Sequence, residues 1–145
     1  MKNHATGSSH EINHLQQLEQ LSGQLLNRRR AVFHLAGDLG TGKSTFVRLA
    51  LARLGFSGPV PSPSYSLINS YEFNGLTVIH SDLYRLTEPE ELLYLDLLEL
   101  AAAADFVFIE WPEKGGDLLP PPDVYCEFTL TGGQRRLWVS PALEN

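Results

Sequence analysis

The chain has 145 residues, of which 43% are hydrophobic and 19% are charged, an ordinary balance for one globular domain with its own core. Its formal net charge of -6 argues against a broad nucleic-acid-binding surface. The single cysteine excludes an intrachain disulfide, and no apolar leader or bilayer-length apolar stretch is present, so the composition predicts a cytoplasmic protein with no membrane contact.

The N-terminal part of the chain is polar at first and then amphipathic. Residues 1–10 are predicted to be disordered, and residues 11–145 to form a single domain. The segment from Glu11 to Asn27 has leucines at helical spacing, which predicts a helix capped by Ser9. Arg28-Arg29-Arg30 follows this segment. We expect these arginines to lie beside the negative end of that helix rather than to contact RNA.

A glycine-rich segment, Gly37-Asp38-Leu39-Gly40-Thr41-Gly42-Lys43-Ser44, matches the phosphate-binding pattern G-x-x-x-x-G-K-[ST]. The apolar run 31–36 before it predicts a buried strand, and the apolar spacing after it, closed by Gly55, predicts a helix. The free N–H groups at the start of that helix can hold phosphates, Lys43 can reach the β- and γ-phosphates, and Ser44 can bind magnesium. The residues predicted to hold a nucleoside triphosphate are Asp38, Leu39, Gly40, Thr41, Gly42, Lys43, Ser44 and Thr45.

The next segment is rich in proline. Pro59, Pro61 and Pro63 exclude a helix, and hydroxyl groups are available at Ser62, Ser64 and Ser66. In nucleotide-driven switches such a segment folds over the γ-phosphate and supplies a hydroxyl to the metal, while an ordinary connection is the alternative. Beyond it, Asn74-Gly75 between two apolar-rich runs predicts a β-hairpin.

The elements that follow complete an α/β pattern. Thr87 and Glu90 have the spacing of a capping box for a helix beginning near Glu88, and 92–104 predicts one or two short buried helices rather than a partner surface. After the apolar run 106–109, a second hairpin is predicted across 131–133. The fold class predicted is a P-loop NTPase-like mixed β-sheet flanked by helices in three layers.

Two acidic residues follow apolar strands. Glu110 ends the run 106–109, and Asp82 stands two residues past the run 76–80. In open α/β sheets the ligand crevice lies at the carboxyl ends of the strands, so both acids are candidate magnesium ligands. The alternative for either acid is an exposed residue or a helix cap. Magnesium keeps several waters, so one direct or water-mediated contact is expected.

Other polar and aromatic residues near these acids are less specific. His34 is expected to be a packed core histidine, and His80 either assists Asp82 or is structural. Trp111 either covers the site or packs against its neighbours. Arg85 and Lys114 either place charge near the phosphates or lie on the surface.

Four segments resemble one family in their order along the chain. They are the glycine-rich loop, Ser62-Pro63-Ser64-Tyr65, the stretch from His80 to Leu86, and the stretch from Ile109 to Lys114. Over about residues 11–140 the chain resembles the bacterial tRNA threonylcarbamoyladenosine biosynthesis ATPases of the TsaE (YjeE) family. The resemblance implies a small ATPase that uses ATP or ADP with Mg²⁺. It also implies two related partner proteins, of TsaB and TsaD types, which carry out the transfer that makes N6-threonylcarbamoyladenosine at position 37 of tRNA.

The resemblance also implies roles for particular residues. Lys43, Asp82 and Glu110 would be catalytic, and Ser44 would bind magnesium together with the two acids. Ser64, where the family usually has threonine, would belong to a switch loop, and Trp111 would lie near the nucleotide. ATP turnover would reset the partner complex between cycles, with tRNA involved only indirectly.

Other classes of nucleotide-binding protein are weighed against this assignment. A nucleotide-sensing module with little turnover needs the same loop and differs only in whether Glu110 or Asp82 organises an attacking water. A small-molecule kinase needs an arginine-bearing lid, for which no segment has the length, and a GTPase needs an Asn-Lys-x-Asp motif, which does not follow the loop. No arginine finger is identifiable, which predicts slow turnover that partners stimulate.

Overall fold

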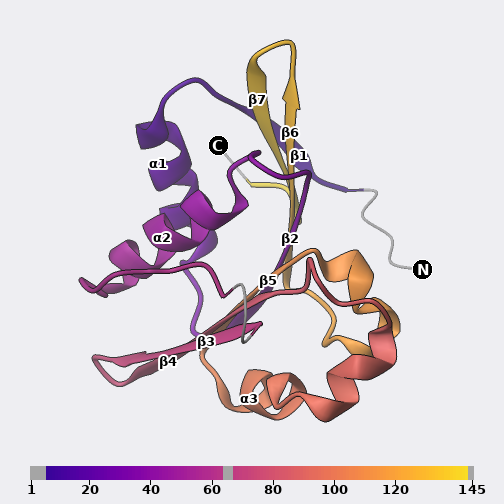
Figure 1. Cartoon of the computed structure of the whole chain (residues 1–145). Helices are drawn as coiled ribbons and strands as arrows, with labels where there is room; N and C mark the ends of the chain where they lie inside the picture. The colour runs from indigo at the N-terminus through magenta and orange to yellow at the C-terminus, as the bar shows by residue number, and fades with distance from the viewer. Residues whose placement is uncertain (1–5, 64–66, 144–145) are drawn as a thin grey trace.

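The computed structural model describes residues 6–63 and 67–143, and in these residues one mixed sheet forms the centre of the fold (Figure 1). The strands are β1 (Ser8–Ile12), β2 (Ala31–Ala36), β3 (Ile68–Phe73), β4 (Leu76–Asp82), β5 (Phe106–Glu110), β6 (Val124–Thr131) and β7 (Gln134–Ser140). The α-helices are α1 (Leu15–Leu25), α2 (Lys43–Leu54) and α3 (Leu97–Ala103), and the 3-10 helices are η1 (Pro89–Tyr94), η2 (Pro112–Lys114) and η3 (Gly116–Leu118).

The strand order is β1-β7-β6-β2-β5-β4-β3. β2 runs parallel to β5 and β6, and β4 runs parallel to β5, while β3–β4, β6–β7 and β1–β7 are antiparallel pairs. Both predicted hairpins are confirmed. Asn74-Gly75 and Gly132-Gly133 all have positive φ angles, the geometry that two-residue hairpin turns require.

The apolar side chains gather in two clusters, one on each face of the sheet. One cluster joins α1 and α2 to the sheet around the rings of Phe33, Phe46 and Phe108, which pack at tilted and edge-to-face angles. The other places η1 and α3 over Val107 and Ile109. α1 and α2 lie side by side, apart from α3 (Figure 1). The predicted three-layer α/β architecture is confirmed, and because the central strands are parallel, their carboxyl ends lie at one edge.

The N-terminal prediction is wrong in part. Residues Ser8–Ile12 form an edge strand, with Ser8 opposite Val139 and Ile12 opposite Arg135, so residues 8–10 are not disordered and no helix begins at Glu11. The helix begins at Leu15 instead, where the side-chain oxygen of Gln17 accepts from the backbone N–H groups of residues 13 and 14 at 2.6 and 3.0 Å. The strand was missed because its partner, β7, is more than a hundred residues away.

Two contacts predicted at helix ends have different partners in the structure. Arg30 donates to the carbonyls of Ala101 and Ala102, so it lies at the negative end of α3 rather than of α1. Thr87 donates to the carboxylate of Glu91 and not of Glu90, because the backbone is extended at the intervening residue 88 and a 3-10 turn follows it. In the part of the chain that the structure describes, no helix is both long and apolar enough to cross a bilayer.

Candidate nucleotide-binding site

The glycine-rich loop connects β2 to α2, as the sequence predicts. Gly37, Gly40 and Gly42 have φ angles of 141°, 77° and 119°, which glycine adopts without strain. The loop lies close against β6, since a Cβ on Gly37 would stand 2.5 Å from the carbonyl oxygen of Phe128. α2 begins at Lys43, directly after Gly42, so the N–H groups of its first turn follow the loop glycines, which is the arrangement that holds phosphate.

Lys43 is the first residue of α2 and is only 5% exposed. Its ammonium donates to the backbone oxygens of Gly37 and Asp38, the latter at 2.9 Å, and lies 4.3 Å from the centroid of the Trp111 ring. Burial lowers the pKa of Lys43, and the negative charge of Glu110 is the largest of the effects that oppose the shift. The lysine is thus held in the mouth of the loop by weak acceptors that a phosphate can replace.

The two predicted acids meet at one point. β4 and β5 are parallel with Asp82 opposite Glu110, so both carboxylates lie at the same edge of the sheet. Glu110 is only 2% exposed, and its two oxygens lie 3.3 and 3.2 Å from the Ser44 hydroxyl, which donates to them. Its Oε2 also lies 2.6 Å from Nε2 of His80. The structure therefore joins the end of β5 directly to the first turn of α2.

Asp82 is half-buried and accepts the backbone N–H of Tyr84 at 3.0 Å. Burial raises the pKa of Asp82 and the charge of Glu110 adds to this, while the Tyr84 hydrogen bond, His80 and Lys43 oppose it. The two acids differ accordingly: Glu110 is fixed by side-chain contacts on two sides, whereas Asp82 has greater access to solvent.

The oxygens of Ser44, Asp82 and Glu110 are hard donors of the kind that magnesium prefers. Within the described residues, no group of three or more His, Cys, Asp or Glu side chains is placed to hold a metal ion. Such a small donor set suits an ion that keeps several of its waters and binds through one or two carboxylates and a ligand's phosphates. The residues present therefore fit magnesium.

Trp111 lies beside these groups. Its backbone is left-handed, with φ 58° and ψ 51°, a conformation that is uncommon for a bulky residue and of a kind found enriched at functional sites. The indole ring lies between the Lys43 ammonium and the ring of Tyr84, whose centroid is 5.0 Å away. It therefore both packs and covers the lysine, the two roles that the sequence left open.

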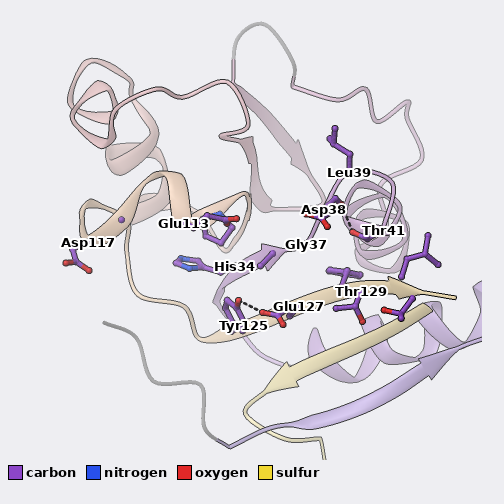
Figure 2. Close-up of a pocket in the computed structure, with 16 residues that line it drawn as sticks. His34, Gly37, Asp38, Leu39, Thr41, Glu113, Asp117, Tyr125, Glu127 and Thr129 are labelled. Carbon is purple, nitrogen blue, oxygen red and sulfur yellow. Dashed lines mark hydrogen bonds between the residues drawn. The ribbon is translucent and has the colours of Figure 1, made fainter. Parts of the chain in front are cut away.

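A large cavity of about 760 Å³ is lined by residues of the loop, of β6 and of the η2–η3 segment (Figure 2). Its described lining residues include four carboxylates, those of Asp38, Glu113, Asp117 and Glu127, and no lysine or arginine. Tyr125 donates to Glu127 at 2.9 Å across its floor. A polyphosphate would meet like charge here, so the larger cavity is the poorer phosphate site.

A second cavity, of about 270 Å³, adjoins the start of α2. It is lined by Gly42 and Thr45 and by Arg135 and Arg136 of β7, together with residues 12–15. The Arg135 guanidinium is close to the loop, because a Cβ on Gly42 would lie 4.0 Å from its Nη1. Sequence reasoning missed Arg135. The adjacent arginines in the last hairpin were its only local signal, and they gave no hint that β7 lies near the loop.

The remaining predicted site residues fall in three groups. The Thr41 hydroxyl closes the loop by donating to the Asp38 carbonyl at 2.7 Å, and Thr45 accepts from Arg48 at 3.2 Å. Leu39 is 66% exposed at the tip of the loop. Ser64, with the rest of 64–66, lies outside the described residues, so its predicted role stays a prediction.

Two further residues are placed by their contacts. His34 is a buried core histidine, as predicted, with Nε2 2.9 Å from the carbonyl oxygen of Pro120. The Lys114 ammonium lies 5.4 Å from the centroid of the Tyr84 ring, which places its charge two aromatic rings away from Lys43.

Comparisons with known proteins agree on one family. A sequence model described as "Threonylcarbamoyl adenosine biosynthesis protein TsaE" matches residues 10–137. The tRNA threonylcarbamoyladenosine biosynthesis protein TsaE of Haemophilus influenzae is 39% identical over 101 residues, which cover 70% of this chain and 64% of that protein. Its Rickettsia bellii counterpart is 38% identical over 104 residues, covering 71% of this chain and 72% of that protein. The crystal structure of YdiB from Bacillus subtilis has the same fold, with a TM-score of 0.76, 20% identity, and coverage of 95% and 87% of the two chains.

Proposed function

Because this chain belongs to the TsaE family, we propose that it is a P-loop ATPase that supports the biosynthesis of N6-threonylcarbamoyladenosine in tRNA. The observation that carries the proposal is the meeting of Lys43, Ser44 and Glu110 at the N-terminus of α2. A cation for phosphate and oxygen donors for a metal therefore lie together at the helix N-terminus that follows a glycine-rich loop, the arrangement that binds phosphate in P-loop proteins.

The roles of the side chains follow from their positions. The loop N–H groups and Lys43 hold the β- and γ-phosphates, and Ser44 with Glu110 and Asp82 holds magnesium. When bound, the ion neutralises charge that builds up on the phosphates. Asp82, the more accessible acid, orients the attacking water. Glu110 is fixed on two sides by Ser44 and His80 and acts mainly as a metal ligand.

The smaller cavity provides room for the rest of the nucleotide. The residue after the metal-binding serine, Thr45, lines it together with Arg135. The guanidinium there faces the loop and would contact the α-phosphate or the sugar. In the larger cavity, four carboxylates oppose any phosphate, which favours the smaller one for the nucleotide.

The finer steps of the proposal follow from the family. Residues 62–66 act as the switch that responds to the γ-phosphate, and turnover resets a complex with partners of TsaB and TsaD types. Those partners carry out the transfer to tRNA, so this chain contacts tRNA only indirectly. Turnover by the chain alone is slow, since the sequence offers no identifiable arginine finger.

The test is binding and hydrolysis with magnesium, for the chain alone and with its partners. We expect the wild-type chain to bind ATP and ADP, to hydrolyse ATP slowly, and to turn over faster with partners. Lys43→Ala should lose binding, whereas Arg53→Ala, which removes a positive charge at the other end of α2, should not. Binding without hydrolysis, even with partners, would favour a nucleotide sensor, and no binding at all would refute the proposal.

A further inference from the structure

Two opposite charges are buried in one site without pairing with each other. Glu110 and Lys43 are 2% and 5% exposed, and the negative charge of Glu110 raises the pKa of Lys43 against the effect of burial. Among the described residues, however, the ion pairs within 4.0 Å are His80–Glu110 and Arg136–Glu11. Lys43 is bonded to backbone carbonyls instead, and Glu110 to His80 and Ser44.

The contact between His80 and Glu110 is therefore the ion pair that Glu110 makes in place of one with Lys43. His80 lies on β4 and is paired with Phe108 of β5, and Phe108 stands two residues before Glu110. The His80 ring is 1% exposed. Its Nε2 is 2.6 Å from Oε2 of Glu110, shorter than either contact with the Ser44 hydroxyl. The histidine thus ties the carboxylate to the neighbouring strand.

We propose that His80 is a positioning residue that holds Glu110 beside Ser44 and prevents it from pairing with Lys43. The proposal rests on the proposed function, in which Glu110 binds magnesium and Lys43 binds phosphate. By keeping the two charges apart, His80 leaves both sites open before any nucleotide arrives.

The second ring nitrogen indicates how the histidine does this. Nδ1 of His80 is buried and has no hydrogen-bond partner within the described residues. With its hydrogen on Nδ1, the ring would have an unsatisfied buried donor there, and its bare Nε2 would face a carboxylate oxygen of Glu110 at 2.6 Å. The ring therefore carries its hydrogen on Nε2 and donates it to Glu110, and the tautomer is set by the site.

Removal of this donor has a definite consequence. A carboxylate as buried as Glu110 needs partners, and Lys43 is a buried cation of the same site on which the charge of Glu110 acts. The two would then pair, which would take Glu110 from the metal and Lys43 from the phosphate. A donor of similar reach at residue 80 should prevent this.

The experiment compares ADP affinity with Mg²⁺ and with EDTA in three variants. His80→Leu removes the donor, His80→Gln keeps an N–H at similar reach, and His34→Leu removes an equally buried histidine whose Nε2 contact is a backbone carbonyl. The gain is the ratio of the ADP affinity with Mg²⁺ to the ADP affinity with EDTA. We expect this ratio to be about 10–100-fold smaller in His80→Leu than in the wild type, and to be close to the wild-type value in His80→Gln. His34→Leu should keep the gain, whatever its effect on Tm. Retention of the gain in His80→Leu, or an equal loss in His34→Leu, would overturn the proposal.

A second measurement needs no nucleotide. Proton–nitrogen NMR spectra of the histidine rings in the ligand-free protein should show His80, identified by its absence in His80→Gln, with its hydrogen on Nε2. Its resonances should shift in Glu110→Gln. If they do not shift, the contact is absent and the inference fails, even if nucleotide binds. If wild-type protein binds no nucleotide while the shift is seen, the proposed function fails and the role of His80 in holding Glu110 stands.

Discussion

Two glycines of the loop form a matched pair for testing its geometry. Gly37 and Gly40 both have positive φ angles, 141° and 77°, so alanine is strained at either position. They differ in the space around them. A Cβ at Gly40 would meet nothing within 4 Å, whereas a Cβ at Gly37 would stand 2.5 Å from the Phe128 carbonyl oxygen and 2.9 Å from the Thr41 hydroxyl.

These distances give the expected magnitudes. Gly40→Ala should lower the free energy of unfolding by about 1–2 kcal/mol, the usual cost of left-handed backbone in a residue with a Cβ. Gly37→Ala bears a similar strain and must also displace β6 or the loop, which adds about 1–3 kcal/mol, as overpacking does elsewhere. The difference between the two variants should therefore be about 2 kcal/mol.

The assay is urea unfolding of the nucleotide-free protein, followed by far-ultraviolet circular dichroism, because ligand binding would otherwise shift the apparent stability. The midpoint for Gly37→Ala should be clearly the lower of the two at an unchanged slope. Equal midpoints would show that the loop does not pack against β6 as described, and the placement of the P-loop beside β6 would be refuted.

Four further outcomes are expected. Glu110→Gln should reduce ATP hydrolysis more than it reduces ADP binding in EDTA, measured by single-turnover kinetics and calorimetry; an equal fall in both would make Glu110 structural. Arg135→Ala should weaken ADP binding about tenfold, with or without Mg²⁺, since charged hydrogen bonds are lost; unchanged affinity would exclude the smaller cavity. Burial raises the pKa of Asp82, so the folded state binds its proton more tightly than the unfolded chain and loses stability as pH rises toward that pKa. Asp82→Asn removes this loss, so its free energy of unfolding should rise relative to that of the wild type as pH increases through this range, and a difference that does not change with pH would contradict the shift. Burial likewise raises the pKa of the Cys126 thiol, so iodoacetamide at about pH 8 should label it only after unfolding, and rapid labelling of folded protein would contradict its burial.

Local sequence patterns predicted much of the fold. The glycine-rich loop with its flanking strand and helix, and both hairpin turns, depend on residues adjacent in the chain, so Asn74-Gly75 and the loop glycines carried enough information. Strand β1 was missed because its five residues are stabilised by pairing with β7, and nothing in the local composition of residues 8–12 indicates that partner.

Some features of the candidate site could likewise be predicted from the sequence, whereas others depend on contacts between distant segments. Asp82 and Glu110 were predicted because each follows an apolar strand, and their meeting requires only that the two strands are parallel neighbours. The contact of His80 with Glu110 and the approach of Arg135 to Gly42 depend on strand order and on which face each side chain occupies. Sequence periodicity indicates which face of its strand a side chain occupies, but it does not indicate which strand or loop lies next to that face. These two contacts could therefore be found only from the structure.

The most direct test of the account is mass spectrometry of tRNA nucleosides from cells depleted of this protein. We predict that N6-threonylcarbamoyladenosine falls on depletion and is restored by the wild-type chain and by Arg53→Ala, but not by Lys43→Ala at matched protein level. Unchanged modification on depletion, or full restoration by Lys43→Ala, would contradict the claim that nucleotide held by this P-loop supports the modification.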